Sequence, residues 1–202
     1  VLGSEYRTLW GADVLEDTLC GLSFRLSVPS FYQVNHDMAE VLYDTAVDFA
    51  GLTGHETVLD LYCGIGTIGL TASDKARQVV GVEVNRDAVR DAIGNAKHNG
   101  VKNARFFAAD ATAWIREAAD AGQKADVVFM DPPREGSTPA FIESVARMAP
   151  KRIVYVSCNP ETMARDLALL TQKGYRAEGF TPVDMFPHSA HCEVVGSLVR
   201  VK

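Results

Sequence analysis

A short apolar run that breaks into a glycine-rich turn constrains this sequence more than any other feature. The run, Val58–Leu61, is followed by Gly64, Gly66 and Gly69. Glycines at this spacing allow a tight turn, let a ligand approach the backbone, and let the following helix pack close to its strand. We therefore expect a strand, a loop and a helix start, with a nucleotide-like cofactor bound at the loop.

A second apolar run, Val79–Val82, ends in Glu83, 19 residues after Gly64. A carboxylate at this distance is typical of the residue that binds the two ribose hydroxyls of a nucleotide cofactor. Two interpretations stay open at this point. The cofactor is either a dinucleotide for hydride transfer or S-adenosylmethionine for methyl transfer.

Strand and helix patterns alternate from residue 57 onward. Strands are predicted at 57–62, 78–83, 104–108, 126–130, 152–157, 175–184 and 193–201, and helices at 67–75, 86–98, 111–120, 139–148 and 160–172. This alternation predicts a mainly parallel seven-stranded α/β sheet with ligands at the carboxyl ends of its strands. The last two strands have no helix between them, which predicts an antiparallel pair at the sheet edge. A Rossmann-like sheet of this kind is typical of class I methyltransferases.

The first part of the chain has a different pattern. Residues 1–28 alternate apolar and polar side chains around predicted turns, which indicates short strands at an edge or an entrance. Asn35 is placed to cap a helix predicted at 36–50. We divide the chain into residues 1–35, the tail of a preceding domain or a linker, and a catalytic domain at 36–202. Because the chain begins with Val1 and not with methionine, we expect it to be a fragment of a longer protein.

The composition narrows the class of protein. The 202 residues are 47% hydrophobic and 23% charged, which suits one globular domain. No run approaches the length of a membrane span and the start has no signal pattern, so we expect a cytoplasmic protein. The cysteines at 20, 63, 158 and 192 form no Cys-x-x-Cys pair, which argues against a disulfide framework and structural zinc. The net charge of −6 predicts weak RNA binding by this chain alone.

Two of the predicted strands end in reactive side chains. Asp131 follows the fourth strand and opens a loop that two prolines stiffen. Cys158 follows the fifth strand, just before Asn159 and Pro160, which are placed to begin a helix. The positive end of that helix is expected to lower the thiol pKa and make Cys158 a nucleophile. The alternative for Asp131 is a capped, proline-stiffened turn. The alternative for Cys158 is a buried, inert cysteine at a strand end.

A polar loop precedes the last strand. His188, His191, Cys192 and Glu193 are metal-ligand types, but one loop cluster without a second half rarely closes a metal site, and we expect none. Glu193 begins the last predicted strand, where it can meet Cys158 across the top of the sheet as its base. The alternative is a solvated charge at a strand end.

Five segments taken together resemble the RNA 5-methyluridine methyltransferase family, of the bacterial 23S ribosomal RNA type. They are Ser30–Asn35, Asp60–Gly66, Asp131–Arg134, Ser157–Pro160 and Phe186–Glu193. The resemblance covers essentially the whole chain, and residues 2–11 are similar to the linker that precedes the catalytic domain in ribosomal RNA members. Family members usually carry an N-terminal oligonucleotide-binding barrel, and many carry an iron–sulfur cysteine cluster. Neither is in this sequence, and Cys192 stands where a small apolar residue is expected.

The resemblance implies a role for each candidate site residue. The implied contacts to S-adenosylmethionine are Gln33, Tyr62, Glu83, Asp110 and Asp131, with Thr67 as a weaker candidate. Glu83 is implied to bind the ribose and Asp110 the adenine amine. Cys158 is implied to attack carbon 6 of uracil, and Glu193 to remove the proton from carbon 5 after methyl transfer.

The implied substrate is a specific uridine in RNA, with ribosomal RNA favoured over the T-loop of tRNA. We expect a monomer whose RNA-binding module lies outside this sequence. Three competing hypotheses remain. They are an amine methyltransferase that grips an exocyclic nitrogen with Asp131–Arg134, a nicotinamide dehydrogenase, and a catalytically silent binding module.

Overall fold

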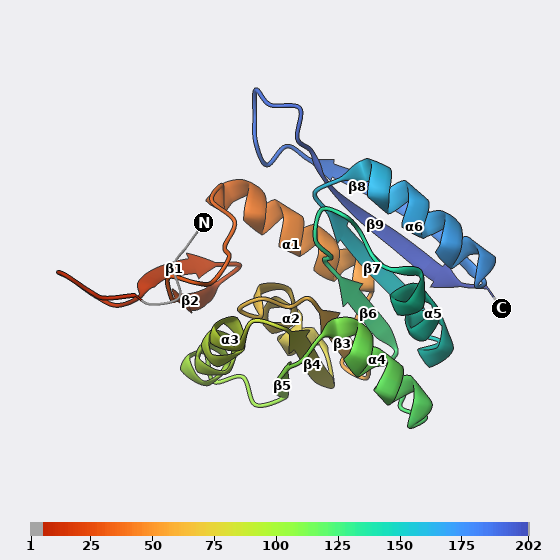
Figure 1. Ribbon diagram of the computed structural model, residues 1–202, viewed down its shortest axis with the longest axis horizontal. Coiled ribbons are helices and arrows are strands. Elements are labelled where there is room, and N and C mark those ends of the chain that lie inside the picture. Colours follow the sequence, from red (N-terminus) through yellow and green to blue (C-terminus); the bar gives the residue numbers. More distant parts are fainter. Residues whose placement is uncertain (1–5, 202) are drawn as a thin grey trace.

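A twisted sheet with helices on both faces forms the body of the molecule, and a small hairpin packs beside it (Figure 1). The computed structural model describes residues 6–201. The linker-like stretch 2–11 therefore lies partly outside the described residues. No helix in the described range is long and apolar enough to cross a membrane.

The predicted alternation of strands and helices is confirmed. The strands are β1 Leu15–Leu19, β2 Leu22–Leu26, β3 Thr57–Leu61, β4 Gln78–Glu83, β5 Ala104–Ala108, β6 Val127–Met130, β7 Arg152–Ser157, β8 Tyr175–Val183 and β9 Glu193–Arg200. The helices are α1 His36–Ala50, α2 Thr67–Thr71, α3 Arg86–His98, α4 Ala111–Asp120, α5 Pro139–Met148 and α6 Pro160–Gln172, with a 3₁₀ turn, η1, at Ser73–Lys75. The helix predicted at 67–75 is thus split. Ser73 Oγ donates to the Leu70 carbonyl at 2.6 Å, a local bond that competes with the helical ladder.

The seven-stranded sheet has the order β5-β4-β3-β6-β7-β9-β8. The first five of these strands are parallel, whereas β9 runs antiparallel to both β7 and β8. The predicted fold class, with an antiparallel pair at the edge, is confirmed. In the β7–β9 register Ser157 is opposite Val194. The next residues, Cys158 and Glu193, are therefore brought to the same end of the sheet.

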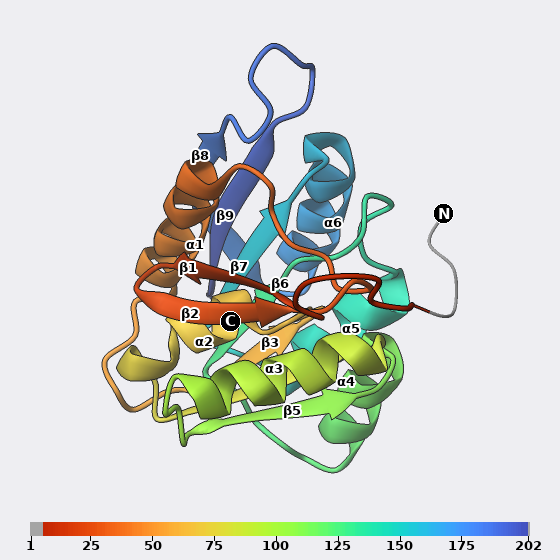
Figure 2. The same cartoon turned by 90° about the vertical axis from the view of Figure 1, so that its left-hand side faces the viewer.

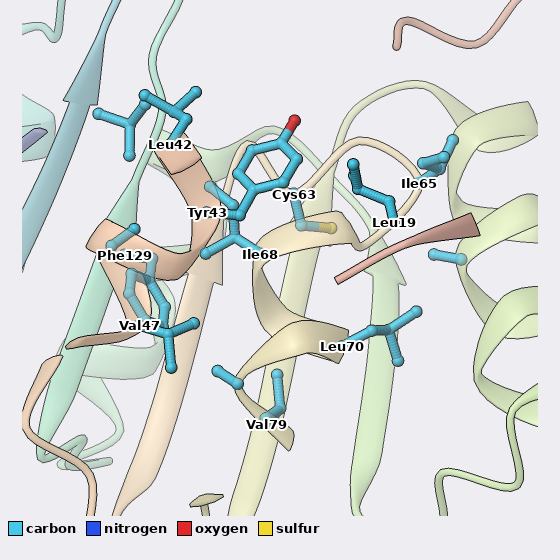
Figure 3. Close-up of a cluster of buried hydrophobic side chains, with 14 of the residues drawn as sticks. Leu19, Leu42, Tyr43, Val47, Cys63, Ile65, Ile68, Leu70, Val79 and Phe129 are labelled. Carbon is cyan, nitrogen blue, oxygen red and sulfur yellow. The ribbon is translucent and has the colours of Figure 1, made fainter. Parts of the chain in front are cut away.

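Side chains alternate between two cores, one on each face of the sheet. On β6, Phe129 belongs to the core beneath α1, α2 and α3, whereas Val128 belongs to the core beneath α4, α5 and α6. This alternation follows from the two-residue period of a strand. Figure 3 shows the first core, in which Leu42, Tyr43 and Val47 of α1 pack toward Phe129 and Ile68.

The hairpin joins the first of these cores. Leu19, Phe24 and Leu26 are buried in the same cluster as α1. The chain reverses at Cys20 and Gly21, both with positive φ, as a two-residue hairpin turn requires. Figure 2 shows the hairpin lying between α1 and α3. The short strands expected in residues 1–28 therefore occur at 15–26.

Candidate active site at the carboxyl ends of the strands

The glycine-rich loop after β3 is shaped by close packing. A Cβ atom on Gly66 would lie 2.9 Å from the Phe106 ring, and one on Gly69 would lie 2.7 Å from Asp60 Oδ2. A Cβ atom on Gly64 would meet nothing within 4 Å in the part of the chain that the structure describes. Gly66 and Gly69 thus let α2 approach the sheet, and Gly64 leaves the backbone open to a ligand.

Glu83, at the end of β4, is tied to this loop. Its Oε2 accepts a hydrogen bond from Gly64 N at 3.1 Å, and its Oε1 accepts one from Asn85 N at 2.8 Å. The carboxylate is partly exposed and lies beside the open glycine. This is where the sequence placed a ribose-binding acid.

Asp60, inside β3, was not predicted as a site residue. It is 1% exposed, its Oδ2 accepts from Gly69 N at 2.8 Å, and its Oδ1 has no partner among residues 6–201. Burial, reinforced by the charge of Glu83 and opposed by the Gly69 N–H, raises its pKa to about 7. The signal in the sequence was an acid within an otherwise apolar strand.

Two further predicted residues follow neighbouring strands. Tyr62 comes directly after β3 with a positive φ of 67°, which is uncommon for a residue other than glycine. Its ring packs against Phe141 at a centroid distance of 5.2 Å, and burial raises its pKa to about 12. Asp110 comes after β5 and is exposed, and its Oδ1 caps α4 by accepting from Ala113 N at 2.8 Å.

The remaining cofactor candidates lie toward α1 and α2. Gln33, in the segment before α1, is 7% exposed, and its side-chain amide makes no hydrogen bond within residues 6–201. Thr67 is buried at the first turn of α2. Asn35 caps α1 as predicted, because its side chain accepts from Met38 N at 3.4 Å.

Cys158 and Glu193 line one cavity of about 280 Å³. Its other lining residues are Arg134, Phe186 and His191. The arrangement follows from topology, because Cys158 directly follows β7 and Glu193 begins the antiparallel β9. Sequence reasoning proposed this pair but assigned no role to the other three residues. The available signal was their position within the same two motifs.

The pKa values in and beside this cavity are raised. Burial raises the pKa of Glu193, and burial together with the charges of Glu193 and Asp60 raises that of Asp131 to about 8. Burial, followed by the charges of Glu193 and Asp131, raises the pKa of the Cys158 thiol. The predicted lowering of this pKa is therefore wrong. Asn159 and Pro160 do begin α6 beside the thiol, but desolvation and two carboxylates outweigh the lowering effects of the Cys158 backbone N–H and of Arg134.

The loop after β6 is fastened to α6, and this fixes Arg134. The Arg134 carbonyl accepts from Asn159 Nδ2 and from Thr162 Oγ1, both at 3.2 Å. Further along the loop, Ser137 N donates to the buried Asp166 at 2.6 Å. The Arg134 guanidinium lies 3.3 Å from His191 Nδ1. A cation therefore lines the same cavity as a thiol and a carboxyl group.

The loop that was considered for a metal has no such arrangement. His188 and His191 are exposed, and the Cys192 thiol lies against the Val183 carbonyl at 3.9 Å. In the described range, no three His, Cys, Asp or Glu side chains gather as metal ligands would.

Comparisons with known proteins agree with this architecture. The family model described as tRNA (Uracil-5-)-methyltransferase matches residues 13–201. A Listeria innocua protein named as an uncharacterized RNA methyltransferase is 48% identical over 195 residues, which are 96% of this chain and 43% of that protein. A Streptococcus mutans protein of the same description is 48% identical over 99% of this chain and 44% of its own length.

The solved structures include a relative with a bound ligand. Pyrococcus abyssi tRNA (uracil-54, C5)-methyltransferase, in complex with S-adenosyl-L-homocysteine, matches with a TM-score of 0.78 and 32% identity over 94% of this chain and 45% of that one. The structure of M. jannaschii TYW2 in complex with AdoMet matches with a TM-score of 0.67 and 19% identity over 96% of this chain and 90% of that one, and it shows the shared fold alone. The chain spans less than half the length of the Listeria innocua, Streptococcus mutans and Pyrococcus abyssi relatives. From the family model and these identities, the chain belongs to the tRNA (uracil-5-)-methyltransferase family.

Proposed function

We propose that this chain is the catalytic domain of an S-adenosylmethionine-dependent RNA methyltransferase that methylates carbon 5 of a uridine. The proposal rests on one observation above all. A thiol and a carboxyl group, Cys158 and Glu193, line one cavity at the carboxyl end of β7, and carbon 5 methylation of uracil requires both groups. An amine methyltransferase or a dehydrogenase needs neither group.

The residues around the glycine-rich loop suit S-adenosylmethionine. Gly64 leaves the backbone open, and the Glu83 carboxylate beside it can accept hydrogen bonds from both ribose hydroxyls. Asp110 keeps one carboxylate oxygen free of the α4 cap and is assigned to the adenine amine. Asp131 and Asp60 supply acidic groups whose raised pKa values fall when a cation is bound. Gln33, Tyr62 and Thr67 are assigned to the rest of the cofactor. When bound, S-adenosylmethionine supplies an electrophilic methyl group on a sulfonium.

Cys158 is the proposed nucleophile, because carbon 5 of uracil is too weak a nucleophile to react unaided. The Cys158 thiol first loses its proton to solvent. The thiolate then adds to carbon 6, and the electron pair of the 5,6 double bond moves to give an enolate that is nucleophilic at carbon 5. Arg134, the cation that lines the cavity, can offset the negative charge of that enolate.

Glu193 is the proposed base. After carbon 5 has gained the methyl group, the Glu193 carboxylate removes its proton, the double bond forms again, and the thiolate leaves. Burial raises the pKa of Glu193, which makes its carboxylate a stronger base than an exposed glutamate. The target uridine must be unpaired or flipped out, since a stacked and paired base could not enter a cavity of about 280 Å³.

The substrate RNA is proposed to be ribosomal RNA, because residues 2–11 are similar to the linker of ribosomal RNA members. The alternative is tRNA, which is the substrate named for the Pyrococcus abyssi relative. Mapping 5-methyluridine in RNA from cells that lack the full-length protein separates the two. A lost 5-methyluridine in tRNA would contradict the ribosomal assignment.

Binding of that RNA is assigned mainly to a module outside this sequence. The chain has a net charge of −6, and phosphate neutralisation supplies most non-specific RNA affinity. We propose a cytoplasmic monomer in which residues 1–35 connect to this module and residues 36–202 form the catalytic domain. Tight RNA binding by the 202-residue chain alone would contradict this division.

A covalent adduct tests the roles of the two cavity residues. In the full-length protein, Glu193→Gln should stall after methyl transfer and accumulate a protein–RNA adduct that carries the methyl group. The matched control, Cys158→Ala, should form no adduct. RNA with 5-fluorouridine should trap the wild-type protein, because fluorine at carbon 5 cannot leave as a proton. Labelled RNA and labelled cofactor on a denaturing gel report all three results.

Two outcomes would overturn the assignment. One is a Glu193→Gln protein that turns over at the wild-type rate, and the other is a Cys158→Ala protein that still forms the adduct. Methylation by Cys158→Ala at an exocyclic nitrogen would favour the amine methyltransferase. Calorimetry with S-adenosylhomocysteine and with NAD addresses the cofactor, and tight binding of NAD alone would favour the dehydrogenase.

A further inference from the structure

Helix α3 presents three polar side chains, Asp91, Asn95 and Asn99, to the edge of the hairpin, and we call them the polar row. Asn99 Oδ1 accepts from Ser23 N at 2.9 Å, and Asn99 Nδ2 donates to the Ser23 carbonyl at 2.7 Å. Asn95 repeats this double contact with Arg25, at 2.8 and 3.2 Å. Each amide thus satisfies both backbone groups of one β2 residue, as a neighbouring strand would.

The spacing of the polar row explains why a helix can replace a strand here. Four residues of an α-helix advance by about 6.0 Å, and two residues of a strand advance by about 6.6 to 6.8 Å. Side chains at every fourth position of α3 therefore match alternate residues of β2. Asn95, in the middle of the row, is fully buried, so its amide has no water to compete for it. Figure 2 shows α3 running beside the hairpin.

The row continues past the end of β2. Asp91 Oδ2 accepts from Ser27 N at 2.9 Å, from Ser27 Oγ at 2.6 Å and from Ser30 Oγ at 2.7 Å. All three groups donate to the same oxygen, and the charge of a carboxylate strengthens such hydrogen bonds. Asp91 therefore holds the start of the segment that follows the hairpin, residues 29–35, which we call the strap.

The strap is fastened at both ends to residues next to the proposed site. Asn85 Nδ2 donates to the Pro29 carbonyl at 3.2 Å, and Asn85 N donates to Glu83 Oε1 at 2.8 Å. At the other end, Asn35 Nδ2 donates to the Met185 carbonyl at 3.0 Å. The strap therefore connects the proposed ribose carboxylate with the loop that leads into the catalytic cavity.

Gln33 lies within the strap and is 7% exposed. We propose that Asp91, Asn95 and Asn99 are positioning residues, which fix the strap so that Gln33 is held ready for the cofactor. The inference rests on the proposed function, in which Gln33 contacts S-adenosylmethionine. The polar row itself touches neither cofactor nor substrate. Its effect on cofactor affinity passes through Gln33, and this separates positioning from a general contribution to stability.

A double-mutant cycle on the 202-residue chain tests this. The dissociation constant of S-adenosylhomocysteine is measured by calorimetry for wild type, Asn95→Ala, Gln33→Ala and the double variant. We expect each single substitution to raise it about three- to tenfold, the range for one lost hydrogen bond. The double variant should bind as Gln33→Ala does, because the polar row has nothing left to position.

Two further variants keep the test sharp. Asn103→Ala removes two side-chain-to-backbone bonds of similar length, to the Ser73 and Ala76 carbonyls at 2.8 and 2.9 Å, far from the strap in sequence. It should lower stability as Asn95→Ala does, without changing the dissociation constant. If Asn95→Ala fails to fold, Ser30→Ala removes one strap bond to Asp91 and should weaken binding by a smaller factor.

Each contrary result has a distinct meaning. The positioning role would be overturned if the factors by which Asn95→Ala and Gln33→Ala raise the dissociation constant multiplied in the double variant. It would also be overturned if the dissociation constant were unchanged in both Asn95→Ala and Ser30→Ala. Either result would leave the proposed function intact. An unchanged dissociation constant in Gln33→Ala would overturn the Gln33 assignment and this inference with it. A wild-type chain that does not bind S-adenosylhomocysteine would overturn the proposed function itself.

Discussion

The two ends of the parallel strands hold their carboxylates in opposite ways. At the amino ends, Asp126 accepts from Thr57 N at 3.0 Å and pairs with Lys151 at 3.1 Å, and these contacts lower its pKa. Nearby, partial burial acts to raise the pKa of Glu56, but hydrogen bonds from the Thr53 hydroxyl and backbone lower it to about 2. These charges are satisfied within the chain.

At the carboxyl ends the pattern is reversed. Burial raises the pKa values of Asp60, Asp131 and Glu193, and one oxygen of Asp60 has no partner among residues 6–201. Carboxyl groups that are buried without compensating partners reduce the stability of the fold. They are typical of sites that bind a ligand or transfer a proton. The comparison indicates that the carboxylates at the amino ends of the strands stabilise the fold, whereas those at the carboxyl ends are typical of a functional site.

The sharpest test applies the same substitution at both ends. In the full-length protein, Glu193→Gln should lower the multiple-turnover rate, measured as release of methylated RNA, by about 10²- to 10⁴-fold, the usual contribution of a general base. Glu56→Gln should leave that rate unchanged and lower the free energy of unfolding at neutral pH. Methyl-transfer assays and urea unfolding measure the two effects. A loss of activity in Glu56→Gln without a loss of stability would break the comparison.

Cofactor affinity gives the next largest effect. Glu83→Ala should weaken S-adenosylhomocysteine binding by roughly 1.5 to 3 kcal/mol, or about 10- to 150-fold, because a charged acceptor of two hydroxyls is lost. Glu143→Ala, which removes the exposed partner of Lys173, is the control and should bind normally. Calorimetry on the 202-residue chain gives both values. An unchanged dissociation constant would remove Glu83 from the site.

The pH dependence of stability should differ in sign at the two ends. Asp131 has a pKa raised from its usual 3.8 to about 8, so the folded state keeps a proton that the unfolded chain loses. Wild-type stability should therefore fall as pH rises from about 4 to about 8. Asp131→Asn should reduce this decline, to which Asp60 and Glu193 also contribute, and be more stable than wild type at pH 8 by on the order of 1 kcal/mol or more.

Asp126 should show the opposite trend. Its lowered pKa stabilises the fold above the usual value of 3.8, and this contribution is lost as pH falls through the lowered value. Asp126→Asn should thus be less stable than wild type at pH 6, and the difference should vanish in acid. Urea unfolding at several pH values tests both variants. Parallel pH curves for Asp131→Asn and Asp126→Asn would contradict the distinction.

The smallest effect is expected from an exposed ion pair. Lys151 lies 3.1 Å from Asp126, but its side chain is 83% exposed. Lys151→Met should lower the free energy of unfolding by only about 0.2 to 1 kcal/mol, and less at high salt. Thermal unfolding at two salt concentrations measures this. A larger loss would mean that the cation, and not the Thr57 N–H, is the main support of Asp126.

The sequence predicted the scaffold well, because strand periodicity, glycine spacing and capping residues act locally. Asn35 and Asn159 cap α1 and α6 as predicted, and the parallel strands follow from their alternation with helices. The strand order, with β9 between β7 and β8, was not predicted. The meeting of Cys158 and Glu193 in one cavity was also predictable, because both lie at predicted strand ends of one sheet.

The missed features depend on distant residues. The pKa direction of Cys158 was wrong because it is decided by burial and by Glu193 and Asp131, which reach it only in the folded chain. The contact of Arg134 with His191 joins residues that are 57 positions apart. The sequence contains the polar row as three Asx residues spaced four positions apart. It does not indicate that they bind the backbone of β2.

The insertion of β9 between β7 and β8 also has a consequence for synthesis on the ribosome. Among the described residues β9 is the last strand to be translated, yet it is flanked on both sides in the sheet. Cys158, the proposed nucleophile after β7, therefore leaves the exit tunnel before Glu193, the proposed base on β9. Until then β7 has an open edge, which is the kind of unpaired strand that aggregates or recruits a chaperone. The sheet and the cavity are thus completed in the same step, when β9 pairs with β7 and brings Glu193 to Cys158.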